Sequence, residues 1–144
     1  MSADSTVIFI DSNCWLYVYL PDQDPPKRDR LLQRLASCQR PIVSTQVLAE
    51  IGANLFKKAK ASEDQQRAVL DELTSQTTVV PVTAATMYRA SHVRTSGTWS
   101  YWDSLIVAAA LESNCTELWS EDLQHNQIVE GRLRIVNPLC EPEA

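Results

Sequence analysis

The chain is 144 residues long with a formal net charge of −5, and 44% of its residues are hydrophobic and 22% charged. These values predict one globular domain over residues 1–144, and they argue against disorder and against indiscriminate nucleic-acid binding, which needs a basic surface. No apolar run is long enough to span a bilayer, and residues 1–6 lack the basic flank of a signal peptide, so we expect a cytoplasmic protein without membrane contact.

Apolar runs alternate with helical patterns along the chain, which predicts repeated β-α units and a mostly parallel sheet. The expected strands span about residues 7–10, 41–44, 78–82, 118–120 and 133–136. The expected helices span residues 13–20, 26–37, 45–60, a segment from 62 onward, 83 to about 97, and 103–112. The predicted fold class is α/β, with a central sheet of about five strands flanked by helices.

Local signals support several of these helices. Pro26 suits the first turn of a helix, after an expected loop over residues 22–26. Ser62 and Gln65 have the spacing of a capping box. The segment 103–112 is apolar nearly all round, so we expect that helix to be buried.

Four acidic residues stand next to these elements. Asp11 closes the first apolar run, Asp122 follows the fourth, Asp103 opens the buried helix, and Glu50 lies in the helix after the second strand. Ligands of a parallel sheet bind beyond the carboxyl ends of its strands, so the spacing predicts that these acids meet there. Carboxylates gathered in this way repel one another unless protons or cations intervene, and the matching cation is Mg²⁺ or Mn²⁺.

Each acid also has an ordinary structural explanation. Asp11 could cap a helix, and Asp103 could complement a helix dipole. Asp122 could set a turn, and Glu50 could be a solvated helix residue. The apolar neighbours of Asp11 and Asp103 favour a shared pocket instead, because an unpaired charge against apolar surface is costly.

The segments around the four acids resemble the motifs of PIN-domain nucleases, and most of all the VapC-type toxin ribonucleases of toxin–antitoxin pairs. The four matching segments are residues 10–13 (Ile-Asp-Ser-Asn), 47–50, 101–110 and 118–125. The resemblance covers nearly the whole chain. Ser104 stands where the family more often has Ala, and Asn126 stands where it often has Gly. Asn tolerates the left-handed conformation, so the turn can persist.

This resemblance implies a PIN-like three-layer domain that cleaves RNA as a metal-dependent endoribonuclease. It implies that the catalytic residues and metal ligands are Asp11, Glu50, Asp103 and Asp122, and that Asn13 and Ser120 orient these carboxylates. The implied cofactor is Mg²⁺ or Mn²⁺. The implied partners are an RNA substrate, a cognate antitoxin protein and a second copy of the chain, as in a type II toxin–antitoxin system.

Two other functions remain open on the sequence. The domain could keep the fold and serve as a non-catalytic scaffold that binds RNA or protein, although the presence of all four acids weakens that reading. It could also be a metal-dependent phosphohydrolase that attacks small phosphomonoesters through a nucleophilic Asp. That class usually needs Asp-x-Asp after the first strand, and Asn13 fills the second Asp position.

Several further residues have more than one interpretation. His125 follows Asp122 closely, and a loop residue satisfied by the backbone is favoured over a catalytic base. The aromatic residues Trp99, Tyr101 and Trp102 are favoured as core or dimer contacts over base-stacking platforms.

The cysteines and the basic clusters carry weaker signals. The four cysteines form no CxxC pair, so they are expected to be small buried residues rather than zinc ligands. Basic residues cluster within residues 27–34 and 57–60, which is compatible with a phosphate-bearing substrate. For any single lysine there, a solvated helix surface is the simpler interpretation.

Overall fold

The computed structural model describes residues 6–20 and 23–140. One sheet runs through it, with the strand order β3-β2-β1-β4-β6-β5. The strands are β1 (Ile8–Ile10), β2 (Ile42–Ser44), β3 (Thr78–Val80), β4 (Glu117–Trp119), β5 (Ile128–Val129) and β6 (Leu133–Val136). Only β5 runs antiparallel to its neighbour; the other pairs are parallel. The predicted α/β class with a mostly parallel sheet is therefore confirmed.

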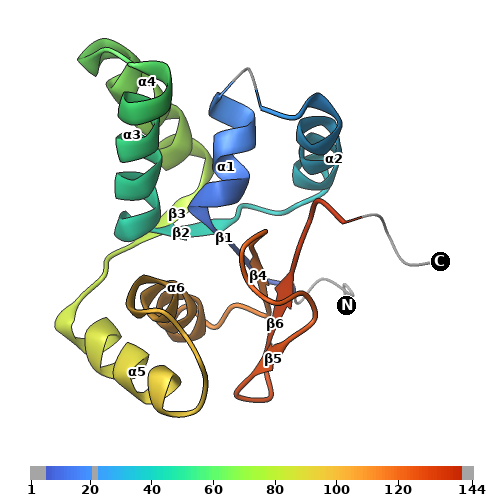
Figure 1. The fold of residues 1–144 in the computed structure, drawn as a ribbon, viewed down its shortest axis with the longest axis vertical. Helices are drawn as coiled ribbons and strands as arrows, with labels where there is room; N and C mark the ends of the chain where they lie inside the picture. Colours follow the sequence, from blue (N-terminus) through green and yellow to red (C-terminus); the bar gives the residue numbers. More distant parts are fainter. Residues whose placement is uncertain (1–5, 21–22, 141–144) are drawn as a thin grey trace.

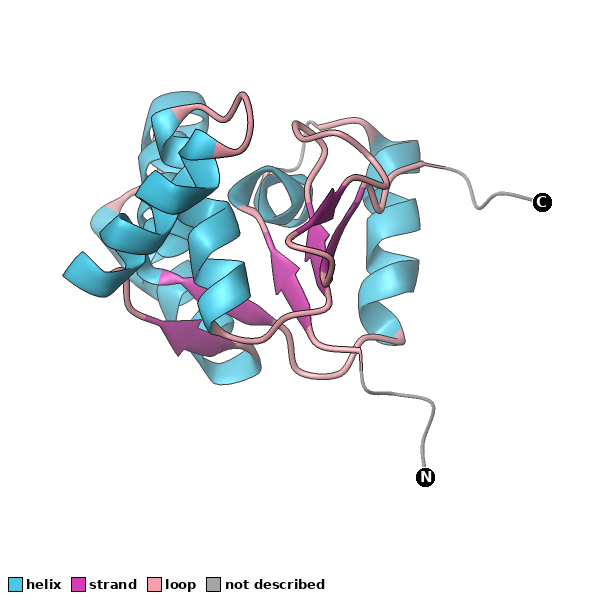
Figure 2. Ribbon diagram, turned by 90° about the horizontal axis from the view of Figure 1, so that it is seen from below, coloured by secondary structure: helices cyan, strands magenta, loops and turns pink. Residues whose placement is uncertain are grey.

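Helices cover both sides of the sheet, which gives the expected three layers (Figures 1 and 2). They are α1 (Ser12–Tyr19), α2 (Pro25–Ala36), α3 (Thr45–Ala59), α4 (Glu63–Gln76), α5 (Ala84–Thr95) and α6 (Tyr101–Glu112). In Figure 1, α1 to α4 lie on one side of the sheet, and α5 and α6 lie on the other.

The structure differs from the sequence prediction by one additional strand and at the starts of two helices, besides shifts of one or two residues at other ends. β5 was not predicted, because a strand of two residues has no measurable periodicity, so the sheet has six strands in place of five. Helix α2 begins at Pro25 after the N-cap Asp24, which shortens the expected loop; Asp22 lies outside the described residues. Helix α6 begins at Tyr101, because the Ser100 hydroxyl accepts a hydrogen bond from the Asp103 backbone N–H and caps the helix.

The core lies on both faces of the central strands. Every residue of α6 from Ser104 to Leu111 is buried, as the all-round apolar pattern predicted. Phe9, Leu118 and Ile135 on the three central strands are fully buried. The capping box of Ser62 with Gln65 is also present. Burial of this kind fixes the strand ends, and with them the polar side chains that follow.

Candidate active site

Asp11 lies directly after β1, where it caps α1, and only 5% of its surface is exposed. Its Oδ1 accepts a hydrogen bond from the Ser12 backbone N–H at 2.7 Å, and its Oδ2 accepts one from the Ser120 hydroxyl at 3.0 Å. The two residues meet because β1 and β4 are parallel neighbours with Ile10 opposite Trp119. The polar side chains that follow β1 and β4 therefore lie close together at the carboxyl ends of these strands, as predicted.

Asn13 joins Asp11 to Asp122. Its Nδ2 lies 3.3 Å from Asp11 Oδ2, 3.1 Å from Ser120 Oγ and 3.2 Å from Asp122 Oδ2. Its Oδ1 accepts a hydrogen bond from the Glu121 backbone N–H at 3.1 Å, which fixes the amide orientation. Asn13 and Ser120, both predicted to orient carboxylates, thus contact the carboxylates directly.

Glu50 reaches the same region from α3. Its Oε1 accepts a hydrogen bond from the Ser12 hydroxyl at 3.0 Å, and its Oε2 accepts one from Gln46 Nε2 at 3.3 Å. Gln46 also donates to the backbone carbonyl of Trp102 at 3.2 Å, so it ties α3 to the start of α6. The sequence prediction missed both donors. The signal for Gln46 was available, since it lies one helical turn before Glu50, whereas the contact of Ser12 with Glu50 depends on how two separate helices pack.

Asp103 occupies the first turn of α6 and is partly buried. Together with Asp122 it lines an open cavity of about 230 Å³, with Trp99 and Gln124 among the other lining residues. Its charge acts on Asp11, as does that of Glu50. The four predicted acids are therefore brought to one region, from β1, α3, α6 and the loop after β4.

Among the described residues, the negative charge of these carboxylates is not balanced by basic side chains. Burial raises the pKa of Asp11 from 3.8 to about 7; the hydrogen bonds from Ser12 and Ser120 oppose that shift, and the charges of Glu50 and Asp103 add to it. Within residues 6–20 and 23–140, none of the four acids forms an ion pair with Lys or Arg. A set of carboxylate oxygens without a basic partner fits a hard divalent cation in its chemistry.

The carboxylates are nevertheless not packed into a finished ligand cage. No group of three His, Cys, Asp or Glu side chains in the described part of the chain is arranged closely enough to hold a metal ion. Hydrogen bonds from Ser12, Asn13 and Ser120 occupy several of the carboxylate oxygens. The donor chemistry therefore fits a divalent cation, and the hydrogen-bond donors hold the carboxylates in an open arrangement.

A fifth carboxylate, Glu121, lies beside this centre and was not predicted. Tyr17 donates a hydrogen bond to its Oε1 at 2.7 Å, and Lys27 Nζ pairs with its Oε2 at 2.8 Å. Burial, and then the contact with Glu121, raise the pKa of Tyr17 to about 12, so the phenol keeps its proton and remains a donor. Glu121 is thus neutralised by its own partners, in contrast to the adjacent Asp122.

The remaining candidates have mixed outcomes. His125 Nδ1 accepts a hydrogen bond from the Asn137 backbone N–H at 2.9 Å, which confirms a loop residue satisfied by the backbone. Trp99 packs against the core as expected. Tyr101 and Trp102 are 49% and 62% exposed, so a core role is wrong for them. Their rings contact each other edge to face, with 5.2 Å between the ring centroids.

The four cysteines differ in how far they are buried. All four are free thiols, and Cys14 and Cys115 are buried as expected. Cys38 is only partly buried and Cys140 is exposed, which corrects the expectation for those two. Cys38 follows α2 and packs against the edge of the core, and Cys140 is the last described residue. Burial raises the pKa of Cys14 well above its ordinary value, so this thiol beside Asn13 is not a nucleophile.

These observations define the protein as an α/β domain with an acidic centre at the carboxyl ends of its parallel strands. The sequence matches the PIN domain family model over residues 8–130, and the chain belongs to that family. A comparison with curated proteins gave no match.

Solved structures with the same fold come from toxin–antitoxin pairs. A toxin–antitoxin complex from Klebsiella pneumoniae has a TM-score of 0.68 at 16% identity, over 92% of this chain and 98% of that one. VapC20 of Mycobacterium tuberculosis, described as a sarcin-ricin loop cleaving toxin, has a TM-score of 0.65 at 19% identity, over 80% and 91%. VapBC2 from Rickettsia felis, bound to a promoter DNA fragment, has a TM-score of 0.63 at 21% identity, over 90% and 98%. These likenesses confirm the predicted PIN-like fold. Among the described residues, no helix combines the length and the apolar character that crossing a membrane requires.

Proposed function

We propose that this PIN domain is a metal-dependent endoribonuclease and the toxin of a toxin–antitoxin pair. The observation that carries the proposal is the placement of Asp11, Glu50, Asp103 and Asp122 at one edge of the sheet without a basic partner. Carboxylates are costly to gather in this way, so the arrangement needs a cation that the side chains do not supply. The proposed ligands are these four acids, and the proposed ion is Mg²⁺ or Mn²⁺.

When bound, such an ion supplies positive charge for phosphodiester hydrolysis, by activating water and stabilising charge on the phosphate oxygens. The chain itself orients the carboxylates. Ser12 holds Glu50, while Asn13 and Ser120 hold Asp11 and Asp122. Donors of this kind fix ligand orientation and tune affinity.

Water is the proposed nucleophile, rather than the ribose 2′-OH. A metal-free ribonuclease would need a base, and His125 is the histidine nearest in sequence to the acidic centre. Its Nδ1 is occupied by the Asn137 N–H, so in the neutral ring the proton sits on Nε2. Neither ring nitrogen then has a free lone pair to accept the 2′-OH proton. This supports hydrolysis at the acidic centre.

Two exposed apolar surfaces support the proposed protein partners. Phe56 and Leu70, which are 62% and 43% exposed, line a groove of about 390 Å³ on α3 and α4. On α5 and α6, Tyr88 and Trp102 are 75% and 62% exposed. Exposed apolar patches of this kind mark interaction sites. The similar structures from toxin–antitoxin complexes support an antitoxin as one partner. A second copy of the chain is the partner proposed for the other surface.

Two measurements test the proposal together. RNA ends should be mapped after brief expression, and the purified chain should cleave RNA with Mg²⁺ or Mn²⁺ and lose activity in EDTA. Asp103→Asn should reduce the rate by about a thousandfold or more, as expected for loss of a metal-ligand carboxylate. Asp71→Asn on exposed α4 removes the same charge and is the matched control. Full activity in EDTA would exclude the metal-dependent mechanism.

The same assays separate the rival functions. A non-catalytic scaffold would bind metal or RNA without turnover. A phosphohydrolase would release phosphate from small phosphomonoesters. Asn13 argues against the latter, because its amide donates to carboxylates at the position where that class places a second Asp.

A further inference from the structure

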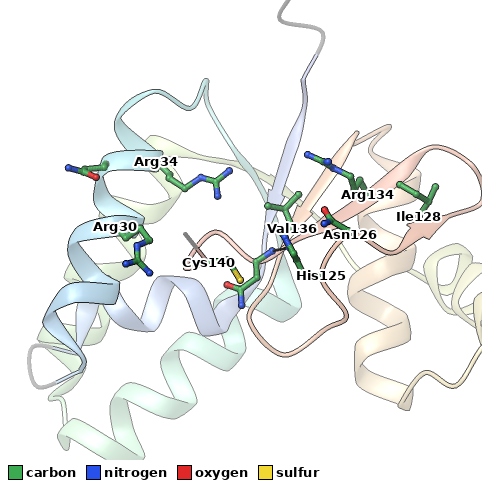
Figure 3. A pocket seen from close by; sticks show the side chains of 10 residues that line it. Arg30, Arg34, His125, Asn126, Ile128, Arg134, Val136 and Cys140 are labelled. Carbon is green, nitrogen blue, oxygen red and sulfur yellow. Dashed lines mark hydrogen bonds between the residues drawn. The ribbon is translucent and has the colours of Figure 1, made fainter. Parts of the chain in front are cut away.

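A larger cavity, of about 750 Å³, lies between α2 and the β5–β6 hairpin (Figure 3). Its volume falls within the range of roughly 300–1,000 Å³ that is usual for ligand sites. In Figure 3, Arg30 and Arg34 come from α2 on one side, Arg134 comes from β6 on the other, and His125 lies between them. We call this cavity the arginine pocket, and define its cationic wall by Arg34 and Arg134. None of the four acids of the acidic centre lines this cavity.

Arg34 is held in place without an acidic partner. Its guanidinium lies over the ring of Trp119, 5.2 Å from the ring centroid. Among the described residues it forms no ion pair. Stacking on an aromatic face restricts the guanidinium plane and leaves its N–H donors available. A pre-oriented guanidinium of this kind suits a planar or tetrahedral oxyanion.

Arg134 faces the same cavity with most of its donors free. Among the described residues it is paired with Glu117, with 3.8 Å between Nη2 and Oε2, which is too long for a hydrogen bond. Glu117 is also engaged at Oε1, which accepts a hydrogen bond from Trp119 Nε1 at 3.0 Å. The Arg134 side chain is 51% exposed. It can therefore donate to a ligand while keeping the weak ion pair.

His125 adds a neutral donor between the two arginines. Because Nδ1 accepts the Asn137 N–H, the Nε2 atom carries the proton and can donate to a ligand. Arg30 is already engaged, since it donates to the Leu139 carbonyl, so Arg34 and Arg134 supply the cationic wall. The pocket thus offers two cationic forks and one imidazole N–H to an anionic ligand.

The pocket is connected to the acidic centre by one short loop. Asp122 belongs to the acidic centre and His125 to the pocket, and three residues of chain span at most about 10 Å between their Cα atoms. An extended single strand of RNA covers that separation within a few nucleotides. A strand placed over the acidic centre can therefore follow this loop to His125, which lines the same pocket as Arg34 and Arg134. This continuity favours RNA over an acidic protein segment as the occupant.

We propose that the arginine pocket binds a backbone phosphate of the RNA strand, beside the phosphodiester that the acidic centre cleaves. This inference rests on the proposed ribonuclease function, whose substrate it helps to place. The chain is acidic overall, so a local cationic site compensates for the repulsion between RNA and the protein. A phosphate contact gives affinity and register without reading sequence.

The test measures binding of a fluorescein-labelled single-stranded RNA by anisotropy, in Mg²⁺ and in an Asp103→Asn background that spares the RNA. Arg134→Gln and Arg34→Gln are compared with Arg67→Gln, which loses the same charge from an exposed site on α4. One single-strand phosphate contact changes the salt slope by about 0.7, so at 0.1 M salt each pocket variant should bind about fivefold more weakly. Both should also lose about 0.7 from the salt slope, while Arg67→Gln changes neither value.

Several outcomes would overturn the proposal. Pocket variants that bind RNA as Arg67→Gln does would remove the phosphate site. Variants that lose affinity only for a polyglutamate peptide would make the pocket a protein site, and loss of affinity only for inorganic phosphate would make it a small-anion site. A parallel cleavage assay with Asp103 intact separates the two proposals. If the wild type cleaves RNA and the pocket variants bind RNA with unaltered affinity, only the pocket proposal is wrong. If the pocket variants bind RNA more weakly but the wild type does not cleave it, only the nuclease proposal is wrong.

Discussion

The Ser12 hydroxyl donates a hydrogen bond to Glu50 Oε1 at 3.0 Å, although the two residues are 38 positions apart. Ser12 is the first residue of α1, and Glu50 lies within α3, so the bond joins two separately folded helices. The backbone N–H of the same serine donates to Asp11. Ser12 therefore sets the relative position of two carboxylates that repel each other.

Ser12→Ala should weaken metal binding and RNA cleavage by roughly tenfold to a hundredfold, which is the usual cost of losing a donor that orients a metal ligand. The fold should be retained, because the backbone bond to Asp11 does not need the hydroxyl. Titration of Mg²⁺ against cleavage rate measures the effect. Ser91→Ala, on the exposed side of α5, is the matched control. Equal metal dependence in the two variants would contradict the role given to Ser12.

The raised pKa of Asp11 predicts how the metal-free protein responds to pH. With a pKa of about 7 in the folded state and 3.8 when unfolded, Asp11 binds its proton more tightly in the folded state. Its stabilising contribution is thus complete below pH 3.8 and is lost as pH rises through about 7. In EDTA, the free energy of unfolding should fall between pH 5 and pH 8, by up to about 3 kcal/mol.

Urea unfolding of the wild type and Asp11→Asn at both pH values isolates this effect, since the other titrating groups are common to the two proteins. The substitution should flatten the decline and raise stability at pH 8. Asp71→Asn, at an exposed position, should leave the decline unchanged. An equal change in stability between pH 5 and pH 8 in the wild type and in Asp11→Asn would show that Asp11 is not protonated at the lower pH.

Hydrolysis by water predicts the chemistry of the cut ends. In-line attack by water displaces the 3′ oxygen, so the products should carry a 5′-phosphate and a 3′-OH. Replacing the ribose on the 5′ side of the scissile phosphate by deoxyribose should leave cleavage intact, unless that 2′-OH is also used for recognition. Mass spectrometry of the products decides that case. A 2′,3′-cyclic phosphate would rule out the mechanism assigned to the four acids.

A homodimer is expected in solution, with a mass about twice the 16.2 kDa of the chain. The exposed aromatic residues of α5 and α6 are the expected contact, so Tyr88→Lys should shift the protein toward monomer in sedimentation velocity. Phe56→Lys, on the separate groove of α3 and α4, should leave the mass unchanged and weaken antitoxin binding. A wild-type protein that sediments as a monomer at micromolar concentration would count against the dimer.

The placement of Asp11 and Asp122 could be predicted from sequence, because the carboxyl ends of parallel strands meet at one edge. The contact of Glu50 with Ser12 could not, because it depends on how α1 packs against α3. Likewise, Glu121 and Asp122 are adjacent in sequence, and only the turn after β4 turns the first toward Lys27 and the second toward Asn13.

The arginine pocket illustrates the same limit. In the sequence, Arg30 and Arg34 belong to a basic cluster interpreted as a solvated helix surface, and Arg134 lies a hundred residues later. Only the packing of α2 beside the β5–β6 hairpin brings them to one cavity. The two-residue strand β5, which contributes Ile128 to this cavity, was itself below the length at which alternation can be detected.

The two outer strands of the sheet have a consequence for how copies of the chain can associate. At one border stands β3, with three residues and Pro81 directly after it, and at the other stands β5, with two residues. Strands this short, one of them followed by a residue without a backbone N–H, offer a poor template for pairing with a neighbouring molecule. Oligomers and antitoxin complexes should therefore form through side chains on the helices, and the protein should resist the edge-to-edge growth that leads to β-aggregates.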